Sequence, residues 1–411
     1  MNILFLTLAN VKTLNTQGIY EDLLREFARN GHAIYVVSPV ERRLGEETHL
    51  IREENCSILR VKTGNVQKTN ILEKGLSTVM LESQFIKAIR EHLAQVKFDL
   101  VLYSTPPITL AGAVEYVKKR DGAKTYLLLK DIFPQNAVDL GMMQETGIKS
   151  VIYRNFRKKE KQLYELSDYI GCMSPANVEF LLKHNPEVAA DRVEVCPNCI
   201  EAVDMSVATE EKTVMREKYG IPVDRKVFVY GGNLGRPQGI PFLIDCLRSQ
   251  KDNEEVFFLI VGSGTEYGKL EQFIQTEQPK NVKLMSSLPR AEYDRLVGSC
   301  DVGMIFLDHR FTIPNFPSRL LSYMQAKIPV LAVTDPNTDI GKIAVEGDFG
   351  WWCESNSTKM FSEAVHRATQ MDPSQMEQMG QRGWAYLNAN YDTHTAYETV
   401  LRRICGQGDE K

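Results

Sequence analysis

Residues 227–247 read VFVYGGNLGRPQGIPFLIDCL, and this stretch decides the fold. Four β-prone apolar residues end at Tyr230, four glycines punctuate residues 231–239, and an apolar helical pattern begins at Ile240. A buried strand that runs through a glycine-rich turn into a helix is typical of a Rossmann-like unit. Glycines let backbone amides approach an anion, and Arg236 adds positive charge. The stretch predicts a phosphate-binding turn, although tight turns of any α/β protein also use glycine.

The same order of strand, polar loop and helix recurs on both sides of this stretch. Buried strands are expected at residues 3–8, 33–37, 99–103, 126–129, 192–198, 226–230, 256–261, 282–285, 302–306 and 330–333. Alternating strands and helices favour parallel sheets. We therefore expect an α/β protein with two doubly wound parallel sheets.

The chain has 411 residues, more than one hydrophobic core usually supports. Its polar stretch at residues 201–224 is typical of a linker. The predicted domains are residues 1–200 and residues 205–389, with a C-terminal helix at about residues 390–411 packed back on the first domain.

Several classes of protein fit the composition poorly. A formal net charge of -4 argues against a protein built to neutralise nucleic-acid phosphates. No apolar run approaches the roughly 20 residues of a membrane-spanning helix, and residues 1–8 lack the features of a signal peptide. Eight scattered cysteines favour a reduced compartment, and Cys196-Pro-Asn-Cys199 fits a turn better than a zinc or redox site. We expect a cytoplasmic protein.

A second candidate anion site lies at residues 313–324, IPNFPSRLLSYM. Its prolines precede a helix that has Ser318 in the first turn. Free amides of Ser318, Arg319 and Leu320 would point out from the positive end of the helix dipole. An ordinary capped helix explains this segment alone, but two helix-start anion sites in one domain suit a diphosphate.

Taken together, these motifs resemble glycosyltransferase family 4, whose members are retaining enzymes of the GT-B fold. The resemblance runs in order through nearly the whole chain and is closest to a bacterial subgroup that builds polysaccharides. It rests on the segments 196–198, 232–239, 259–264, 281–284, 288–289, 300–304, 316–321 and 328–332. It implies two Rossmann-like doubly wound domains that face each other across a cleft.

The resemblance also implies where a nucleotide-sugar donor binds in the second domain. The nucleobase would lie near Ser263 and Leu288, the diphosphate near Gly232 and the amides from Ser318 onward, and the sugar near residues 307–311. The expected donor-binding residues are Gly232, Asn233, Gly235, Gln238, Gly262, Ser263, Leu288, Pro289, Asn315, Phe316, Pro317, Ser318, Leu320 and Ser322.

This sequence departs from the family pattern at charged positions. Two acidic residues of the family fall on Pro314 and Ser322, and its phosphate-binding Arg and Lys fall on Asn233 and Gln238. Arg236 and Arg319 are therefore the predicted catalytic cations, which would stabilise the leaving diphosphate. We interpret the departures as features of the subgroup.

In the first domain, Lys130 and Asp131 follow a buried strand, where an acceptor hydroxyl would be held. Asp131 is the candidate to accept its proton. The alternatives are that Asp131 is a turn residue and that the leaving phosphate takes the proton. The other candidate acceptor-side residues are Gln17, Gly18 and Thr105. We expect no metal and no cofactor, because the histidines do not cluster and the resemblance implies a metal-free enzyme.

Residues 148–163 combine lysines and arginines with Ile148, Val151, Ile152 and Phe156 at helical spacing. Such a helix fits either the surface of an anionic membrane or a solvated charged face on a core. The first possibility suits a lipid-linked acceptor at the inner face of the plasma membrane.

The sequence thus predicts a transferase that moves a hexosyl or N-acetylhexosaminyl group, with retention, from a nucleotide donor that we expect to be uridine-based. The acceptor would be a glycan or lipid-linked saccharide of a surface polysaccharide such as capsule or O-antigen, and no nucleic acid is involved. Two alternatives remain. One is a nucleotide-sugar epimerase of the same fold, and the other is a non-catalytic subunit of a transferase complex.

Overall fold

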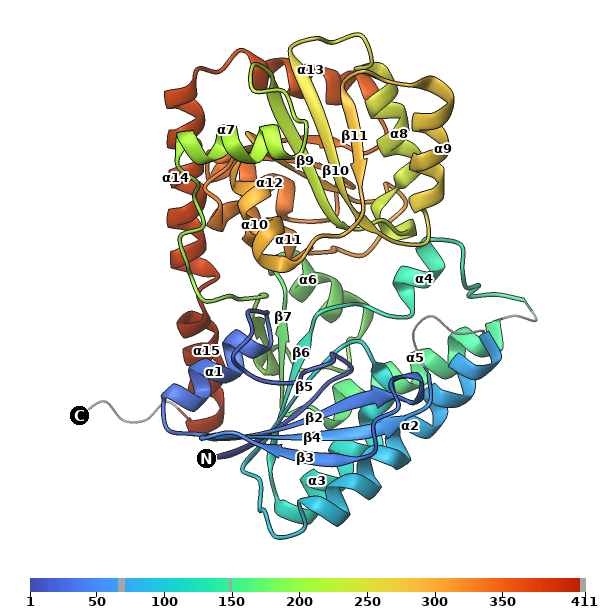
Figure 1. The fold of residues 1–411 in the computed structure, drawn as a ribbon. Coiled ribbons are helices and arrows are strands. Elements are labelled where there is room, and N and C mark those ends of the chain that lie inside the picture. The colour runs from blue at the N-terminus through green and yellow to red at the C-terminus, as the bar shows by residue number, and fades with distance from the viewer. Residues whose placement is uncertain (66–70, 148–149, 407–411) are drawn as a thin grey trace. The chain divides into compact units, whose positions relative to one another are not determined.

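The computed structural model describes residues 1–65, 71–147 and 150–406, with side chains for all of these except residues 71–79. The chain divides into two compact units (Figure 1). Unit 1 comprises Met1–Glu201 together with Thr393–Lys411, and unit 2 comprises Ala202–Asp392. Each unit has its own sheet, helices and hydrophobic core.

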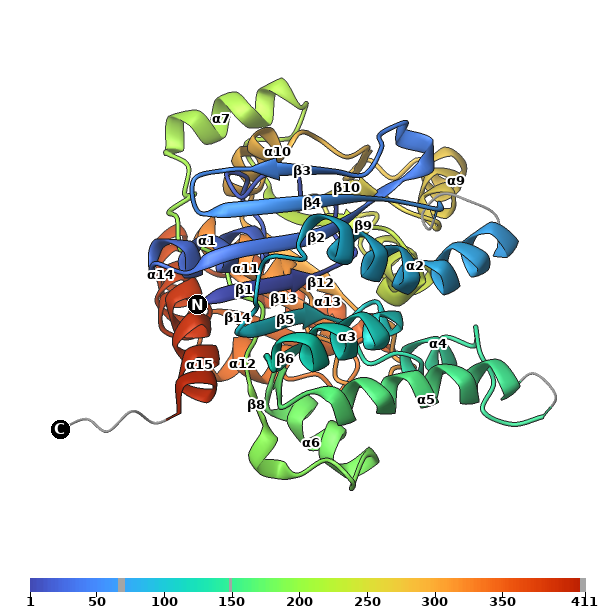
Figure 2. The ribbon, with the colours of Figure 1, turned by 90° about the horizontal axis from the view of Figure 1, so that it is seen from below.

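Unit 1 contains an eight-stranded sheet in the order β3-β4-β2-β1-β5-β6-β7-β8, most of which Figure 2 shows edge to edge. Its strands are β1 Asn2–Leu6, β2 Ala33–Glu41, β3 His49–Arg52, β4 Cys56–Thr63, β5 Leu100–Ser104, β6 Lys124–Leu129, β7 Tyr169–Cys172 and β8 Val193–Val195. The expectation of a wholly parallel sheet is wrong at one edge, because β3 pairs antiparallel with β4. Three residues connect these strands, which is too short for a parallel crossover.

Helices cover both faces of this sheet. They are α1 Glu21–Arg29, α2 Ile71–His92, α3 Ala111–Asp121, α4 Gln135–Asp139, α5 Ser150–Leu166, α6 Pro175–His184 and α15 Thr393–Cys405, with 3-10 turns at Arg42–Leu44, Ile108–Leu110 and Ala190–Arg192. Helix α15 lies against α1 (Figures 1 and 2), where the rings of Tyr397 and Phe27 meet edge to face at 4.9 Å. The last helix of the chain therefore completes the core of unit 1.

Unit 2 contains a six-stranded sheet in the order β11-β10-β9-β12-β13-β14, and all its strands are parallel. They are β9 Lys226–Asn233, β10 Val256–Ser263, β11 Val282–Met285, β12 Val302–Phe306, β13 Val330–Thr334 and β14 Gly350–Glu354. Its helices are α7 Thr209–Lys218, α8 Ile240–Ser249, α9 Tyr267–Glu277, α10 Arg290–Gly298, α11 Arg319–Gln325, α12 Ile340–Glu346, α13 Thr358–Thr369 and α14 Pro373–Asn390, with a 3-10 turn at Arg236–Gln238.

The strand order of unit 2 fixes where a ligand fits. From β9 the chain builds outward through β10 and β11, and then returns to the other side of β9 with β12. The carboxyl ends of β9 and β12 form a topological switch point, the usual ligand site of a doubly wound sheet. The glycine-rich turn follows β9 at this point.

No helix in the described ranges is long and apolar enough to cross a bilayer.

Candidate functional site

A cavity of about 560 Å³ opens at the carboxyl edge of the unit 2 sheet. Loops after β9, β10 and β11 form its walls, together with the first turns of α10 and α11. Its lining residues are Gly231, Gly232, Asn233, Gln238, Val261, Gly262, Ser287, Leu288, Arg290, Tyr293, Pro317, Ser318, Arg319 and Ser322. The cavity brings together two predicted segments, the glycine turn that ends at Gly239 and the helix α11 that starts at Arg319, which are far apart in the sequence.

The backbone conformation of the glycine turn explains why a glycine occurs at position 232. Gly232 has a φ of 110°, which side-chain-bearing residues rarely adopt. Asn233 donates from Nδ2 to Oε1 of Gln238 at 3.2 Å, and the Gly235 amide donates to the same oxygen at 3.1 Å. The two amides that replace the family's cations therefore bind each other and brace the turn.

Arg319 is the cation that the structure places in the cavity. Its guanidinium carbon lies 4.3 Å from the ring centroid of Tyr230, and its Nη1 atom is buried without a hydrogen-bond partner. No carboxylate among the described residues forms an ion pair with it. A partly desolvated charge without a counter-ion is costly, and because Arg319 lines the cavity, an anion bound there would balance it.

Arg236 is placed differently from Arg319. It does not line the cavity, its side chain is 57% exposed, and its Nε lies 3.9 Å from Glu266. The 3-10 turn at Arg236–Gln238 starts with this residue and directs it to solvent. The structure does not place Arg236 with the predicted diphosphate site.

Other predicted donor residues lie beside the cavity without lining it: Gly235, Ser263, Pro289, Asn315, Phe316 and Leu320. The Leu320 side chain is fully buried in the core, and its amide faces the Pro317 carbonyl at 3.4 Å. The amide of Leu320 is therefore not the open anion ligand that the sequence suggested. The Ser263 hydroxyl accepts a hydrogen bond from Ser287, a lining residue, at 3.2 Å.

Five lining residues are not among the predicted site residues: Gly231 and Val261, which lie in the predicted segments, and Ser287, Arg290 and Tyr293, which sequence reasoning missed. Arg290 and Tyr293 lie about one turn apart at the start of α10, directly after Leu288 and Pro289. Nothing local in the sequence indicates that these two side chains line the cavity. Arg290 donates to both oxygens of Asp294, at 2.9 and 2.6 Å, so its charge is already balanced.

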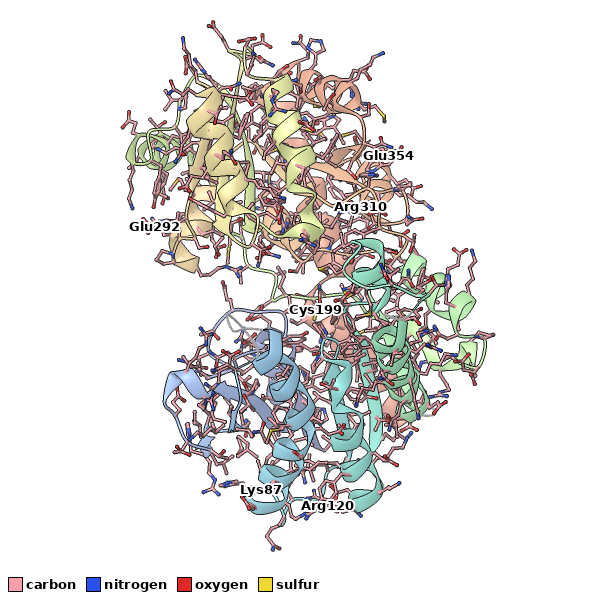
Figure 3. The ribbon with its side chains drawn as sticks, turned by 90° about the vertical axis from the view of Figure 1, so that its right-hand side faces the viewer. Lys87, Arg120, Cys199, Glu292, Arg310 and Glu354 are labelled. Atoms are coloured by element: carbon pink, nitrogen blue, oxygen red, sulfur yellow. The ribbon has the colours of Figure 1, made fainter. Side chains whose placement is uncertain are left out.

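In the loop after β12, where the sugar is expected, Asp308 and Arg310 form an ion pair with each other. Arg310, labelled in Figure 3, donates from Nε and Nη2 to Asp308 at 2.9 and 2.8 Å. Burial raises the pKa of Asp308, but the hydrogen bonds from Arg310 outweigh it and hold this pKa below its usual range. A carboxylate bound in this way is poorly suited to abstract a proton.

The unit 1 candidates Thr105, Lys130 and Asp131 form one structural network. The Thr105 hydroxyl donates to the Asp131 carbonyl and accepts the amides of Lys130 and Asp131, all within 3.0–3.2 Å. The Lys130 ammonium donates to the Pro197 carbonyl at 3.1 Å, and burial lowers its pKa. Thr105 and Lys130 therefore hold the turn that presents Asp131.

Asp131 itself has an unusual environment. Both carboxylate oxygens accept hydrogen bonds from Nδ2 of Asn136, at 2.9 and 2.8 Å. Burial raises the pKa of Asp131 to about 6, against the opposing effect of hydrogen bonds from Ile132 and Asn136. A carboxyl group with this pKa can exchange a proton near neutral pH.

The remaining acceptor-side candidates precede α1. Gln17 is exposed, and the Gly18 amide donates to Oδ1 of Asp22 at 3.1 Å. Gln17 is therefore accessible to a ligand, whereas the amide of Gly18 is used within the fold. Among the described residues, no cluster of three or more His, Cys, Asp or Glu could hold a metal ion.

The basic helix does not have the single apolar face that the sequence suggested. In α5, the Phe156 ring packs edge to face on Phe133 at 5.0 Å, whereas Val151 and Ile152 are 54% and 57% exposed. Ile148 lies outside the described residues. Helix α5 therefore anchors to unit 1 through Phe156 and presents two apolar side chains to solvent near its start.

Comparisons with known proteins match both units. A model described as glycosyltransferase family 4 matches residues 19–203, and one described as glycosyl transferases group 1 matches residues 211–384. The chain is 24% identical over 390 residues to the probable glycosyltransferase WbjE of Pseudomonas aeruginosa, with 93% of this chain and 92% of WbjE covered.

Solved structures share the fold at low sequence identity. Sucrose-phosphate synthase from Thermosynechococcus elongatus has a TM-score of 0.75 at 13% identity and covers 99% of this chain and 100% of its own. Anabaena HepE in complex with UDP and glucose has a TM-score of 0.70 at 15% identity and covers 98% and 99%. Both are similar to this chain in fold.

Proposed function

Because the chain is a glycosyltransferase of family 4 with the GT-B fold, we propose that it transfers a sugar, with retention, from a UDP-sugar to a hydroxyl of a glycan or lipid-linked saccharide in surface polysaccharide synthesis. The observation that carries this proposal is the guanidinium of Arg319, which lines the cavity at the switch point without an ion-pair partner among the described residues and with Nη1 lacking a hydrogen bond. The nucleotide in the HepE structure supports uridine as the base. The relative WbjE supports the transferase activity.

Arg319 would act on the leaving group. Negative charge builds on the diphosphate as the bond to the sugar breaks, and a fixed cation in a buried site stabilises that charge strongly. Arg290 contributes less, because Asp294 already balances it. The amides of the glycine turn add neutral hydrogen-bond donors.

Asp131 is our candidate for the acceptor side in unit 1. Its pKa of about 6 leaves it ionised at neutral pH and able to accept the hydroxyl proton. The loop around Asp131 also leaves two buried amide oxygens, Oδ1 of Asn136 and Oδ1 of Asn198, without a partner. Oxygen acceptors suit a ligand that is rich in hydroxyl donors.

We also propose that α5 contacts an anionic membrane surface, where a lipid-linked acceptor would reside. Val151 and Ile152 are exposed apolar side chains, and Arg154 and Lys158 are exposed basic ones on the same helix. Arg157 pairs with Glu160, so it contributes little to the free charge. Apolar insertion combined with a few basic residues is the usual composition of a peripheral membrane helix.

The direct test is a turnover assay with the purified chain. UDP-, GDP- and ADP-sugars are supplied with synthetic lipid-linked mono- and disaccharides, and nucleotide release and product configuration are measured, the latter by NMR. We expect UDP release that depends on acceptor and a product with the anomeric configuration of the donor. Inversion would contradict the proposal.

Two other outcomes separate the alternatives. Conversion of the UDP-sugar to a different UDP-sugar without acceptor would identify an epimerase. UDP binding without turnover on any acceptor would indicate a non-catalytic subunit.

A further inference from the structure

Three tyrosines surround the Arg319 guanidinium: Tyr230, Tyr293 and Tyr323. Tyr230 presents its ring face to the cation at 4.3 Å, which is favourable cation–π geometry. The surroundings of this charge are therefore aromatic and neutral.

Two of the three hydroxyls are already used by the fold. Tyr230 donates from its hydroxyl to the Asn233 carbonyl at 2.7 Å. The Tyr323 hydroxyl lies 3.0 Å from the Met304 carbonyl and accepts the Gly231 amide at 3.3 Å. These two tyrosines brace the ends of β9 and β12.

The Tyr293 hydroxyl is placed differently. Tyr293 lines the cavity, and its oxygen rests on the glycine turn so closely that a Cβ added to Gly231 would lie 1.7 Å from it. Within the described part of the chain this hydroxyl has no hydrogen-bond partner. A small residue at position 231 is what allows a phenol to reach the turn.

Several other polar side chains of the cavity are already engaged. Asn233 and Gln238 bind each other, and Arg290 binds Asp294. Among the described side chains that line the cavity, Arg319, Tyr293 and the serines Ser318 and Ser322 keep donors for a ligand. Arg319 and Tyr293 lie beside the glycine turn, with Nη2 of Arg319 next to Gly232 and the phenol next to Gly231.

We propose that the Tyr293 hydroxyl donates a hydrogen bond to the diphosphate of the donor, next to Arg319. This contact helps to bind the diphosphate at a turn where the neutral residues Asn233 and Gln238 occupy the positions at which the family has cations. This inference rests on the proposed function and names one further binding residue for it. Burial raises the pKa of Tyr293 to about 12, so the group keeps its proton at neutral pH. A protonated phenol attracts a phosphate oxygen, whereas a phenolate would repel it.

The test is calorimetry of UDP and uridine binding to the wild type and to Tyr293→Phe, which removes only the hydroxyl. We expect UDP affinity to fall about tenfold and uridine affinity to remain unchanged, because the lost hydrogen bond goes to phosphate. Tyr267→Phe, on α9 and outside the cavity lining, is the matched control and should leave both affinities at the wild-type level. The melting temperatures of the variants show whether the fold is intact.

The outcomes separate this inference from the function it rests on. If the wild type binds UDP and Tyr293→Phe binds it equally well, the inference is overturned and the proposed function stands. Parallel losses of UDP and uridine affinity would show that the hydroxyl supports the pocket or the base, which also overturns the inference. If the wild type binds no nucleotide, the proposed function fails and the inference fails with it.

Discussion

The two sheets of this protein end in polar loops of the same kind, yet the loops differ in how their charges are satisfied. At the carboxyl edge of unit 2, Arg319 lines the cavity and has no counter-ion among the described residues. At the carboxyl edge of unit 1, Lys130 is bound by the Pro197 carbonyl and Asp131 by Asn136. Proximity to a strand end was therefore a weaker guide to function than the absence of an internal partner.

The polar groups without a partner differ in chemistry between the two units. In unit 2 the unpaired group is a cationic donor, which suits a diphosphate. Near Asp131 in unit 1, the unpaired groups include the amide oxygens of Asn136 and Asn198, which suit hydroxyl donors. The following experiments test this difference between the two units.

The largest effect is expected from Arg319→Gln. Loss of the charge should lower UDP affinity about 100-fold, because hydrogen bonds to charged groups contribute about 1.5–3 kcal/mol each. The melting temperature of the variant without ligand should change little, because the substitution removes a desolvated charge together with its cation–π contact to Tyr230. Calorimetry and thermal melts measure the two effects.

Arg236→Gln is the matched control for that experiment. Arg236 is largely exposed and faces Glu266, so its substitution should change UDP affinity by less than about threefold. Equal losses in the two variants would contradict the distinction between the two arginines.

Asp131→Asn should change the pH dependence of stability in unit 1. A carboxyl group whose folded pKa is raised to about 6 stabilises the fold below its unfolded pKa, and this stabilisation is lost as the pH rises through 6. Between pH 4 and 7 the variant should therefore gain about 2 kcal/mol relative to the wild type. Urea denaturation at both pH values measures this difference, and a difference independent of pH would count against a buried, titrating Asp131.

The same variant tests the catalytic role. If Asp131 accepts the acceptor proton, Asp131→Asn should slow transfer while UDP affinity stays unchanged. A transfer rate equal to that of the wild type would show that another group, such as the leaving phosphate, accepts the proton.

Thr105→Val tests whether the unit 1 network is structural. The substitution leaves two backbone amides and one carbonyl without their hydroxyl partner, which should cost about 1–2 kcal/mol of stability. UDP affinity should not change. A loss of UDP affinity without a loss of stability would contradict a structural role for Thr105.

The smallest effect is expected at the membrane. Replacing both Val151 and Ile152 by Ser should weaken cosedimentation with phosphatidylglycerol vesicles by about three- to tenfold, because little apolar area is involved. Val214→Ser combined with Val345→Ser removes comparably exposed side chains in unit 2 and serves as the control. Equal binding by all three proteins would argue against α5 as the contact.

Much of the fold could be predicted because apolar runs and glycine turns are local signals. The strand starting at Lys226 and the helix starting at Ile240 begin where the pattern put them, although the strand extends to Asn233. Four strands were missed: β3, β4 and β7 of unit 1 and β14 of unit 2. β3, β7 and β14 have only four or five residues each, and β3 and β14 lie at sheet edges, where the sequence pattern is weak. β4 is an interior strand of eight residues, but Arg60 and Lys62 interrupt its apolar run.

The candidate site was less predictable, because it depends on contacts between distant segments. The placement of Arg319 in the cavity agrees with the sequence reasoning, whereas Arg236 points to solvent. Tyr293 could not be identified from spacing alone, since nothing local indicates that its hydroxyl lies on the turn at Gly231. Candidate residues can be named from residue type and position after a strand. Choosing among them requires the structure, which shows whether each polar group already has a partner.

The most direct test of the account is calorimetry of UDP, UMP and uridine binding to the wild-type chain. If the unpaired guanidinium of Arg319 marks a diphosphate site, UDP should bind at least about 100-fold more tightly than uridine, with UMP between them. Equal affinities for UDP and uridine, or no binding of any of the three, would contradict the central claim.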